Sequence, residues 1–303
     1  MAVREQDMEV QSIHGMESCI MNDYRVEVAQ GARFEFGLNW RKFLKVVDET
    51  RLARAEQTLQ KLLASKDLTG MSFLDIGCGS GIFSLAARRL GARVHSFDYD
   101  STSVRCTAEM KRQFFPADSQ WVVEVGSVID GSYIKSLGQF DVVYSWGVLH
   151  HTGAMWQALT TVRDLVKPGG KLAIAIYNDQ GSRSRYWLLL KKTYNRLPSG
   201  FRGLILWPAF LRLWGPTLAR DLMSGSPFHS WREYSNIRGM SPWRDVVDWV
   251  GGYPFEVAKP ENVFEFYQRR GFTLIGLSTC GGGHGCNEFV FVGHGHHDQN
   301  VGS

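Results

Sequence analysis

Two adjacent histidines and a nearby aspartate are the side chains in this sequence best suited to acid–base chemistry. His150 and His151 follow an apolar segment at residues 140–145, and Asp179 follows a second one at residues 171–176. Histidine, with an unperturbed pKa of about 6.5, can take a proton from a hydroxyl group at neutral pH. We predict His151 as the first candidate for a general base, ahead of His150, with Asp179 on an adjacent loop. Packing of a histidine inside the loop is the alternative role.

A second group of residues forms a glycine-rich turn. Gly77, Gly79 and Gly81 alternate with other residues after an apolar run and before an amphipathic segment at residues 82–90. This order indicates a strand, a tight turn and a helix, which lets the backbone approach a nucleotide-like ligand. The dinucleotide fingerprint has a different spacing, Gly-x-Gly-x-x-Gly. Asp75, before the first glycine, would repel a pyrophosphate but attract a cation. The pattern favours a ligand with ribose, adenine and a positive centre.

An acidic residue ends the next predicted strand. Residues 92–97 form this strand, and Asp98 lies roughly twenty residues beyond the glycine turn, as ribose binding requires. A carboxylate here can accept hydrogen bonds from both ribose hydroxyls. Asp100 is the alternative, or it caps a helix that begins near residue 101.

The elements that must position these residues alternate regularly between strand and helix. Such alternation predicts a parallel sheet, whose ligands bind beyond the carboxyl ends of the strands. Near the C-terminus, a helix at residues 260–270 precedes two strands joined by a glycine turn, which indicates a hairpin. The remaining predicted strands are residues 92–97, 120–125, 140–145 and 171–176, and the hairpin strands are residues 272–279 and 287–292.

The segment before the core is harder to interpret. Residues 1–33 lack clear periodicity, so we predict a partly ordered arm. Apolar residues at helical spacing predict one helix over residues 41–64. Trp40 precedes this helix and either covers the ligand or packs on the surface.

A long segment, residues 181–258, interrupts the alternation and holds six of the ten tryptophans. We predict a helical cap with its own small core. The cap also offers basic residues beside apolar ones, which suits an apolar acceptor or a membrane surface. If the ligand were instead a nucleic acid, Arg183, Arg185, Lys191, Lys192, Arg196, Arg202 and Arg212 would form the phosphate-binding face, but their interleaving with many large aliphatic residues argues against that alternative.

The composition limits the remaining possibilities. The chain has 303 residues, of which 44% are hydrophobic, enough for a full core, and its net charge of +4 is too small to indicate nucleic-acid binding. Five scattered cysteines without a Cys-x-x-Cys pair predict a reducing, cytoplasmic setting. Residues 1–10 are charged and lack the apolar core of a signal peptide. No apolar run spans a bilayer, so we expect at most a peripheral membrane contact.

The glycine turn with its flanking residues resembles motif I of the class I S-adenosyl-L-methionine (SAM)-dependent methyltransferases. The resemblance implies an α/β, Rossmann-like sheet of seven strands with a terminal antiparallel strand, here with a helical cap insert. It also implies SAM as cofactor. Those enzymes often bind the adenine amino group through an acidic residue after the third strand, where this chain has Ser127. The implied cofactor-binding residues are Asp75, Gly77, Cys78, Gly79, Gly81, Asp98, Tyr99, Ser127, Val128, Trp146 and Trp40.

Within that superfamily, Val148-Leu-His-His151 and Ile174-Ala-Ile-Tyr-Asn178 look like stretches of the ubiquinone-type O-methyltransferases. Some of those enzymes bind a divalent metal through glutamates before the histidine. Gly147 and His150 replace those glutamates here, so we predict no metal site. The histidine loop is also loosely similar to that of the cyclopropane-synthase group, which methylates lipid carbons.

These features predict a SAM-dependent methyltransferase that O-methylates a small-molecule or lipid-like acceptor. The alternatives are a tRNA or protein N/O-methyltransferase and a lipid C-methyltransferase; a SAM-binding regulator is disfavoured because the motif is complete. Neither the acceptor nor the oligomeric state follows from the sequence. The expected organisation is an arm and lid helix at residues 1–70, a SAM-binding core at 71–180, an acceptor-side cap at 181–258, the end of the core sheet at 259–293 and a disordered tail at 294–303.

Overall fold

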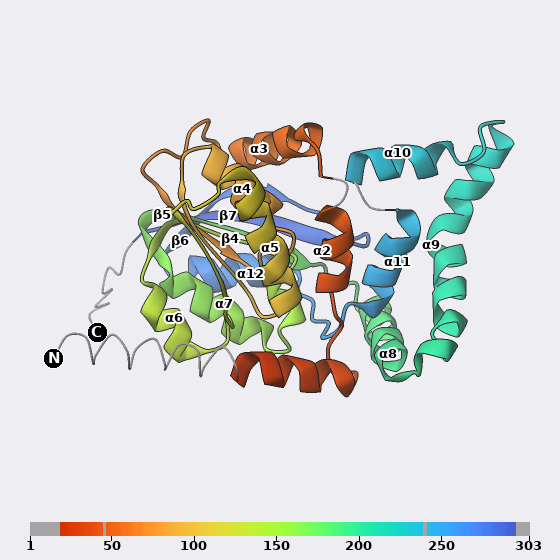
Figure 1. Ribbon diagram of the computed structural model, residues 1–303. Coiled ribbons are helices and arrows are strands. Elements are labelled where there is room, and N and C mark those ends of the chain that lie inside the picture. Colours follow the sequence, from red (N-terminus) through yellow and green to blue (C-terminus); the bar gives the residue numbers. More distant parts are fainter. Residues whose placement is uncertain (1–18, 45–46, 239–240, 295–303) are drawn as a thin grey trace.

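The computed structural model describes residues 19–44, 47–238 and 241–294 (Figure 1). Most of the N-terminal arm and of the tail that the sequence predicts lies outside these residues.

A mixed seven-stranded sheet forms the centre of the molecule, in the order β3-β2-β1-β4-β5-β7-β6. All neighbouring strands from β3 to β5 pair in parallel, whereas β7 is antiparallel to both β5 and β6. This confirms the predicted sheet, its terminal antiparallel strand and the hairpin. The strands are β1 (Ser72–Ile76), β2 (Arg93–Asp98), β3 (Trp121–Val125), β4 (Phe140–Trp146), β5 (Val166–Tyr177), β6 (Phe272–Ser278) and β7 (Cys286–Gly293).

Helices cover both faces of the sheet (Figure 1). On one face, α3, α4 and α5 bury an apolar side against β1, β2 and β4. On the other, α6, α7 and α12 pack against residues of the same sheet, including the hairpin strands. The parallel core is therefore buried on both sides, as its nearly continuous apolar strands require. These helices are α3 (Glu49–Leu63), α4 (Ile82–Arg89), α5 (Ser101–Phe114), α6 (Gly131–Leu137), α7 (Met155–Asp164) and α12 (Pro260–Gln268).

The segment before the core differs from the prediction in two ways. The single helix predicted at residues 41–64 is wrong, because α2 (Gly37–Phe43) and α3 are separate helices. Asp48 has extended φ and ψ, and its side chain accepts a hydrogen bond from the backbone N–H of Arg51, so a new helix begins there. A further helix at residues 19–29 lies within the predicted arm.

The cap consists of α8 (Ser182–Arg196), the short η3 (Ser199–Phe201), α9 (Gly203–Met223), α10 (His229–Arg238) and α11 (Pro242–Gly251). It has an apolar cluster of its own, centred on buried side chains such as Trp187, Phe210 and Val250. In Figure 1 these helices lie together at one side of the sheet, with α9 outermost. No helix among the described residues has the length and apolar character needed to cross a bilayer.

We expect Phe291→Ala to destabilise the fold strongly. Phe291 on β7 is fully buried and packs beside Phe289 and Tyr267. Removing such a ring costs about 3–5 kcal/mol of unfolding free energy, which urea titration measures. Ile275→Ala is the control because that side chain, on the neighbouring strand β6, is 51% exposed. Its free energy of unfolding should change by no more than about 0.5 kcal/mol, and equal losses in both variants would contradict the packing described for β7.

Candidate active site

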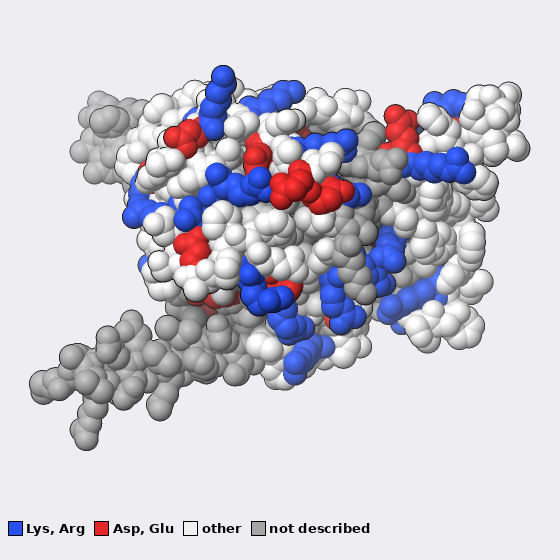
Figure 2. Space-filling view, turned by 45° about the horizontal axis from the view of Figure 1, so that its top comes forward, with Lys and Arg blue, Asp and Glu red and all other residues white. Residues whose placement is uncertain are grey.

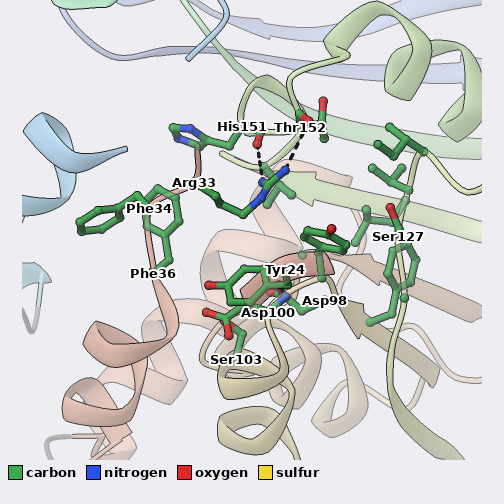
Figure 3. A pocket seen from close by; sticks show the side chains of 18 of the residues that line it. Tyr24, Arg33, Phe34, Phe36, Asp98, Asp100, Ser103, Ser127, His151 and Thr152 are labelled. Carbon is green, nitrogen blue, oxygen red and sulfur yellow. Dashed lines mark hydrogen bonds between the residues drawn. The ribbon is translucent and has the colours of Figure 1, made fainter. Parts of the chain in front are cut away.

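A cavity of about 870 Å³ opens at the carboxyl ends of the parallel strands (Figure 3). The loops after β1, β2, β3 and β4 form its floor. The helix at residues 19–29 and the chain at residues 33–40 cover it from one side, and α11 of the cap contributes the far wall. The position agrees with the rule for ligand sites in open α/β sheets.

The glycine turn after β1 forms part of the cavity floor. Gly77 has φ of 76°, and a Cβ there would collide with the side chain of Val148 from the loop after β4. Gly79 has φ of 56°, and a Cβ there would lie 3.1 Å from the ring of Trp40. Both positions therefore require glycine, for backbone conformation and for space.

Asp98 lies at the end of β2, facing the cavity and linked to the turn. Its carboxylate accepts hydrogen bonds from the backbone N–H groups of Gly79, at 3.0 Å, and Asp100, at 2.9 Å. Burial, and then the neighbouring Asp100 carboxylate, raises the pKa of Asp98 to about 7. Asp100 also lines the cavity, and its carboxylate caps α5 by accepting from the N–H of Thr102, as the sequence suggested. Its other oxygen accepts from the N–H of Gly37.

Most of the other residues implied for cofactor binding also lie in the cavity wall. The loop after β3 lines it from residue 126 to residue 130, and Trp146 lines it at the end of β4, stacked on Tyr144 with ring centres 5.6 Å apart. Trp40, for which two roles were open, faces the cavity over Gly79. The predicted residues that line the cavity are Gly77, Asp98, Tyr99, Ser127, Val128, Trp146 and Trp40.

Other predicted residues have side chains directed elsewhere. Asp75 is buried beneath the turn, where its carboxylate accepts a hydrogen bond from the hydroxyl of Ser84. The Cys78 thiol contacts the hydroxyl of Thr107 at 3.2 Å, and Gly81 begins α4. These residues shape the turn from behind.

His151 is held in one orientation at the cavity wall. Its Nδ1 lies 2.6 Å from the carbonyl oxygen of Pro254, so Nδ1 carries the hydrogen and donates it. The second ring nitrogen, Nε2, is then an acceptor, and among the described residues it has no hydrogen-bond partner. Burial lowers the pKa of His151 to about 3, so the ring is neutral at physiological pH. In Figure 3 it lies next to Phe34 and Phe36, on the opposite side from Ser127.

His150 and Asp179 do not line the cavity. His150 is fully buried, with Nδ1 accepting from the backbone N–H of Tyr177 at 3.2 Å and its ring centre 3.8 Å from that of Tyr177. The carboxylate of Asp179 accepts from the N–H of Gly181 at the start of α8. Tyr177 does line the cavity, so His150 supports its wall from behind.

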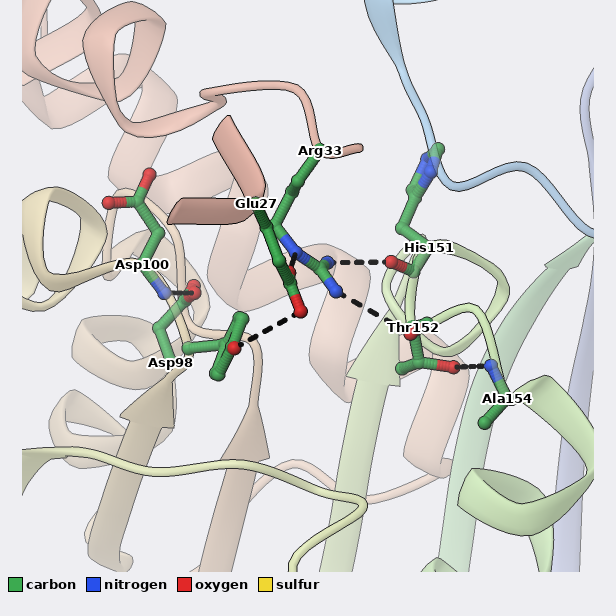
Figure 4. A network of polar contacts seen from close by, with 8 residues as sticks. Glu27, Arg33, Asp98, Asp100, His151, Thr152 and Ala154 are labelled. Carbon is green, nitrogen blue, oxygen red and sulfur yellow. Dashed lines mark hydrogen bonds and ion pairs between the residues drawn. The ribbon is translucent and has the colours of Figure 1, made fainter. Parts of the chain in front are cut away.

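Arg33 joins the N-terminal cover to the histidine loop, and the sequence did not single it out. Its guanidinium pairs with Glu27 at 2.5 Å and donates to the carbonyl oxygens of His151, at 2.8 Å, and Thr152, at 3.5 Å (Figure 4). It also lies 4.8 Å from the ring centre of Tyr99. The apolar pair Ile20 and Tyr24, spaced by four, was the only sequence signal for the helix that carries Glu27.

Two carboxylates of the cap complete the cavity, and sequence reasoning missed both. Asp245 and Asp248 project from α11 one turn apart. Asp245 accepts from the Tyr234 hydroxyl at 2.6 Å, and Asp248 accepts from the side-chain amide of Asn39. Burial raises the pKa of Asp248 to about 7. Acidic residues three positions apart are common on the solvent-exposed face of a helix. The spacing of Asp245 and Asp248 therefore does not indicate a site in the sequence, and only the fold, which places α11 over the cavity, brings them to it.

These features fit SAM. The cavity wall offers bare backbone at the glycine turn, a carboxylate at the end of β2, Ser127 after β3 and the aromatic rings of Trp40 and Trp146. Its many carboxylates also suit a cationic sulfonium.

Comparison with known proteins points to the same ligand. A family model described as a methyltransferase domain matches residues 47–207, more than half of the chain. A ubiquinone biosynthesis O-methyltransferase of Caulobacter vibrioides is 30% identical over 146 residues, 45% of this chain and 54% of that protein. An enzyme of the same name from Brucella melitensis is 29% identical over 115 residues, 38% of this chain and 44% of that protein. The chain thus spans about half the length of the curated relatives it matches.

Among solved structures, PKMT2 from Rickettsia typhi superposes with a TM-score of 0.53 at 15% identity, covering 82% of this chain and 53% of that one. At this identity the likeness concerns the fold alone. Together with the family match, the sheet order and the glycine turn, it leads to one conclusion: this chain belongs to the methyltransferase-domain family, as a class I fold whose cofactor is S-adenosyl-L-methionine.

Proposed function

We propose that this chain transfers the methyl group of SAM to a hydroxyl group of a small-molecule or lipid-like acceptor. The orientation of His151 carries the proposal. A carbonyl oxygen fixes the hydrogen on Nδ1, and Nε2 remains as a proton acceptor at the wall of the cavity. This geometry suits a general base. The lowered pKa keeps Nε2 unprotonated at neutral pH, and it also makes the ring a weaker base than free imidazole.

The charges of the cavity restrict the class of acceptor. Arg33 is the one Lys or Arg among its lining residues, and its charge is already shared with Glu27. Such a surface repels phosphates and carboxylates, so neutral acceptors with hydroxyl groups are favoured over nucleic acids and organic acids. The acidic lining residues are Asp23, Glu27, Asp98, Asp100, Asp130, Asp245 and Asp248.

The protein's part in the reaction is alignment and removal of a proton. Bound SAM would supply a methyl group on a sulfonium sulfur, with S-adenosyl-L-homocysteine as the leaving group when the carbon–sulfur bond breaks. The acceptor oxygen must therefore lie in line with that bond. Phe34, Phe36 and Tyr177 provide flat surfaces that orient a ring or chain beside His151. Such positioning can contribute roughly 7–11 kcal/mol. His151 takes the hydroxyl proton as the new bond to carbon forms.

The direct test supplies radiolabelled SAM with a small-molecule extract, total lipid, tRNA and a protein mixture. Label in the small-molecule or lipid fraction, on an oxygen identified by mass spectrometry, supports the proposal. Label in tRNA or protein instead would replace it with the alternative of N- or O-methylation of a macromolecule.

For the cofactor, we propose that Asp98 binds the ribose hydroxyls. Asp98→Asn should then weaken SAM binding roughly 10- to 150-fold, since a hydrogen bond to a charged group contributes about 1.5–3 kcal/mol. Because the pKa of Asp98 is raised to about 7, wild-type affinity should increase from pH 6 to pH 8 as the carboxylate ionises. Isothermal titration calorimetry at both pH values measures this.

Asp141→Asn is the matched control. Asp141 lies at the start of β4, at the end of the strand remote from the cavity. There the Lys167 ammonium and the Ser72 hydroxyl donate hydrogen bonds to its carboxylate. This variant should lose stability but keep its SAM affinity and the pH dependence. If Asp98→Asn binds SAM with unchanged affinity, Asp98 is not a ribose ligand.

For the acceptor step, His151→Ala should lower kcat by about 10²–10⁴-fold while the Kd for SAM stays unchanged, because a base acts on the acceptor alone. Because the pKa of the ring is lowered to about 3, the base remains unprotonated above that pH. As the pH falls through 6.5, the usual pKa of histidine, protonation of His151 should therefore not lower the rate of the wild type.

His95→Ala serves as the comparison, since His95 on β2 pairs with Glu124 away from the cavity. It should retain normal kcat. Weaker SAM binding in His151→Ala, with little change in kcat at saturation, would assign His151 a structural role in the loop.

A further inference from the structure

Exposed large apolar side chains gather on the cap. Ten of the eighteen found among the described residues lie between residues 186 and 228, a stretch of 43 in a chain of 303. Single exposed apolar residues need no explanation, but such a concentration indicates a contact surface. They are Tyr186, Leu188, Leu189, Phe201, Leu204, Trp207, Leu211, Leu222, Met223 and Phe228.

The centre of this surface is one face of α9. Leu204, Trp207 and Leu211 are spaced by three and four residues, so they share a face of the helix. They are 71%, 60% and 62% exposed, respectively. A neighbouring face, with Leu206 and Phe210, is buried in the apolar cluster of the cap. The Trp207 ring contacts that of Trp243, with ring centres 5.0 Å apart, yet Leu204, Trp207 and Leu211 each keep more than half of their surface exposed.

Positive charge predominates around this face, although the exposed Glu233 lies on the neighbouring helix α10. Residues 181–220 contain eight Lys and Arg residues and no Asp or Glu. The first acid, Asp221, is buried, and its carboxylate accepts hydrogen bonds from the backbone and hydroxyl of Ser230. In Figure 2 the cap, at the right, presents mostly uncharged surface with scattered basic side chains. The basic residues classed as exposed are Arg183, Arg185, Lys192, Arg196, Arg212 and Arg220; Lys191 is buried, so the surface role suggested for it by the sequence is wrong.

We propose that the outer face of α9 docks on an anionic lipid bilayer. The apolar side chains would enter the boundary between headgroups and acyl chains, while the flanking arginines and lysines contact lipid phosphates. Helix α9 would lie on the membrane surface, since no described helix is suited to cross it. The proposal concerns a surface outside the cavity and is independent of the reaction proposed above.

Two other occupants fit the surface less well. A second copy of the chain would bring two positive faces together, which costs energy through like-charge repulsion. A nucleic acid suits the arginines, but it would leave the exposed parts of Leu204, Trp207 and Leu211 without an apolar contact. An anionic bilayer matches both the charge and the apolar centre.

The test is flotation of the purified chain with vesicles of phosphatidylcholine alone and of phosphatidylcholine mixed with phosphatidylglycerol. We expect binding to the mixed vesicles that salt reduces but does not abolish, because an apolar contribution persists. Leu204→Glu with Leu211→Glu should lower binding at least tenfold. Arg212→Gln with Arg220→Gln should lower binding about fivefold per arginine, the equivalent of about 1 kcal/mol each.

Leu277→Glu provides the matched control, because this leucine on β6 is 52% exposed but lies outside the cap. It should bind vesicles like the wild type, and all variants should keep SAM binding and the melting temperature. Three results would overturn the proposal: a wild type that does not float with either vesicle, cap variants that bind as well as the wild type, or a control that loses as much. Self-association abolished by the leucine variants, without vesicle binding, would assign the face to a second copy.

Discussion

The close approach of two turns at the carboxyl edge of the sheet is the constraint on which the site depends. Gly77 leaves no room beyond its Cα because Val148 fills the space where a Cβ would be. The N–H groups of Gly77 and Gly79 are held by the carbonyl oxygen of Phe97 and the carboxylate of Asp98. A side chain at Gly77 would separate the β1 turn from the β4 loop. It would therefore disturb Asp98 and the histidine loop together.

Buried charges link the cap to this edge. Lys191 lies beside the rings of Trp249 and Phe255, at 4.5 and 4.7 Å, and donates to the carbonyl oxygen of Trp249. Burial lowers the pKa of Lys191 to about 7, while the nearby Asp248 carboxylate opposes that shift. The electron-rich ring faces partly replace the water that an ammonium loses on burial. Since Asp248 also faces the cavity, the charge state of the cap core and that of the cavity wall are coupled.

The sheet and the part of the cavity wall around the glycine turn could be predicted from sequence because local patterns specify them. Strand periodicity, the glycine turn and Asp98 each depend on residues within a few positions. The wall formed by the N-terminal segment and the cap could not, since Arg33 and Asp248 reach it from segments more than two hundred residues apart in the sequence. Their roles depend on the N-terminal helix and the cap folding over the same edge. The same limit applies to His150, which the sequence places beside His151 but the fold buries behind Tyr177.

The cap has two distinct faces joined by one apolar core. The inner helix α11 presents Asp245 and Asp248 to the cavity, and the outer helix α9 presents its apolar, positively charged face to the surroundings. Phe210 and Val246, one from each helix, lie in the same buried cluster. Close-packed interiors transmit displacement instead of absorbing it. A surface that holds α9 therefore also fixes the position of α11, and with it the acidic wall where we propose that the acceptor binds.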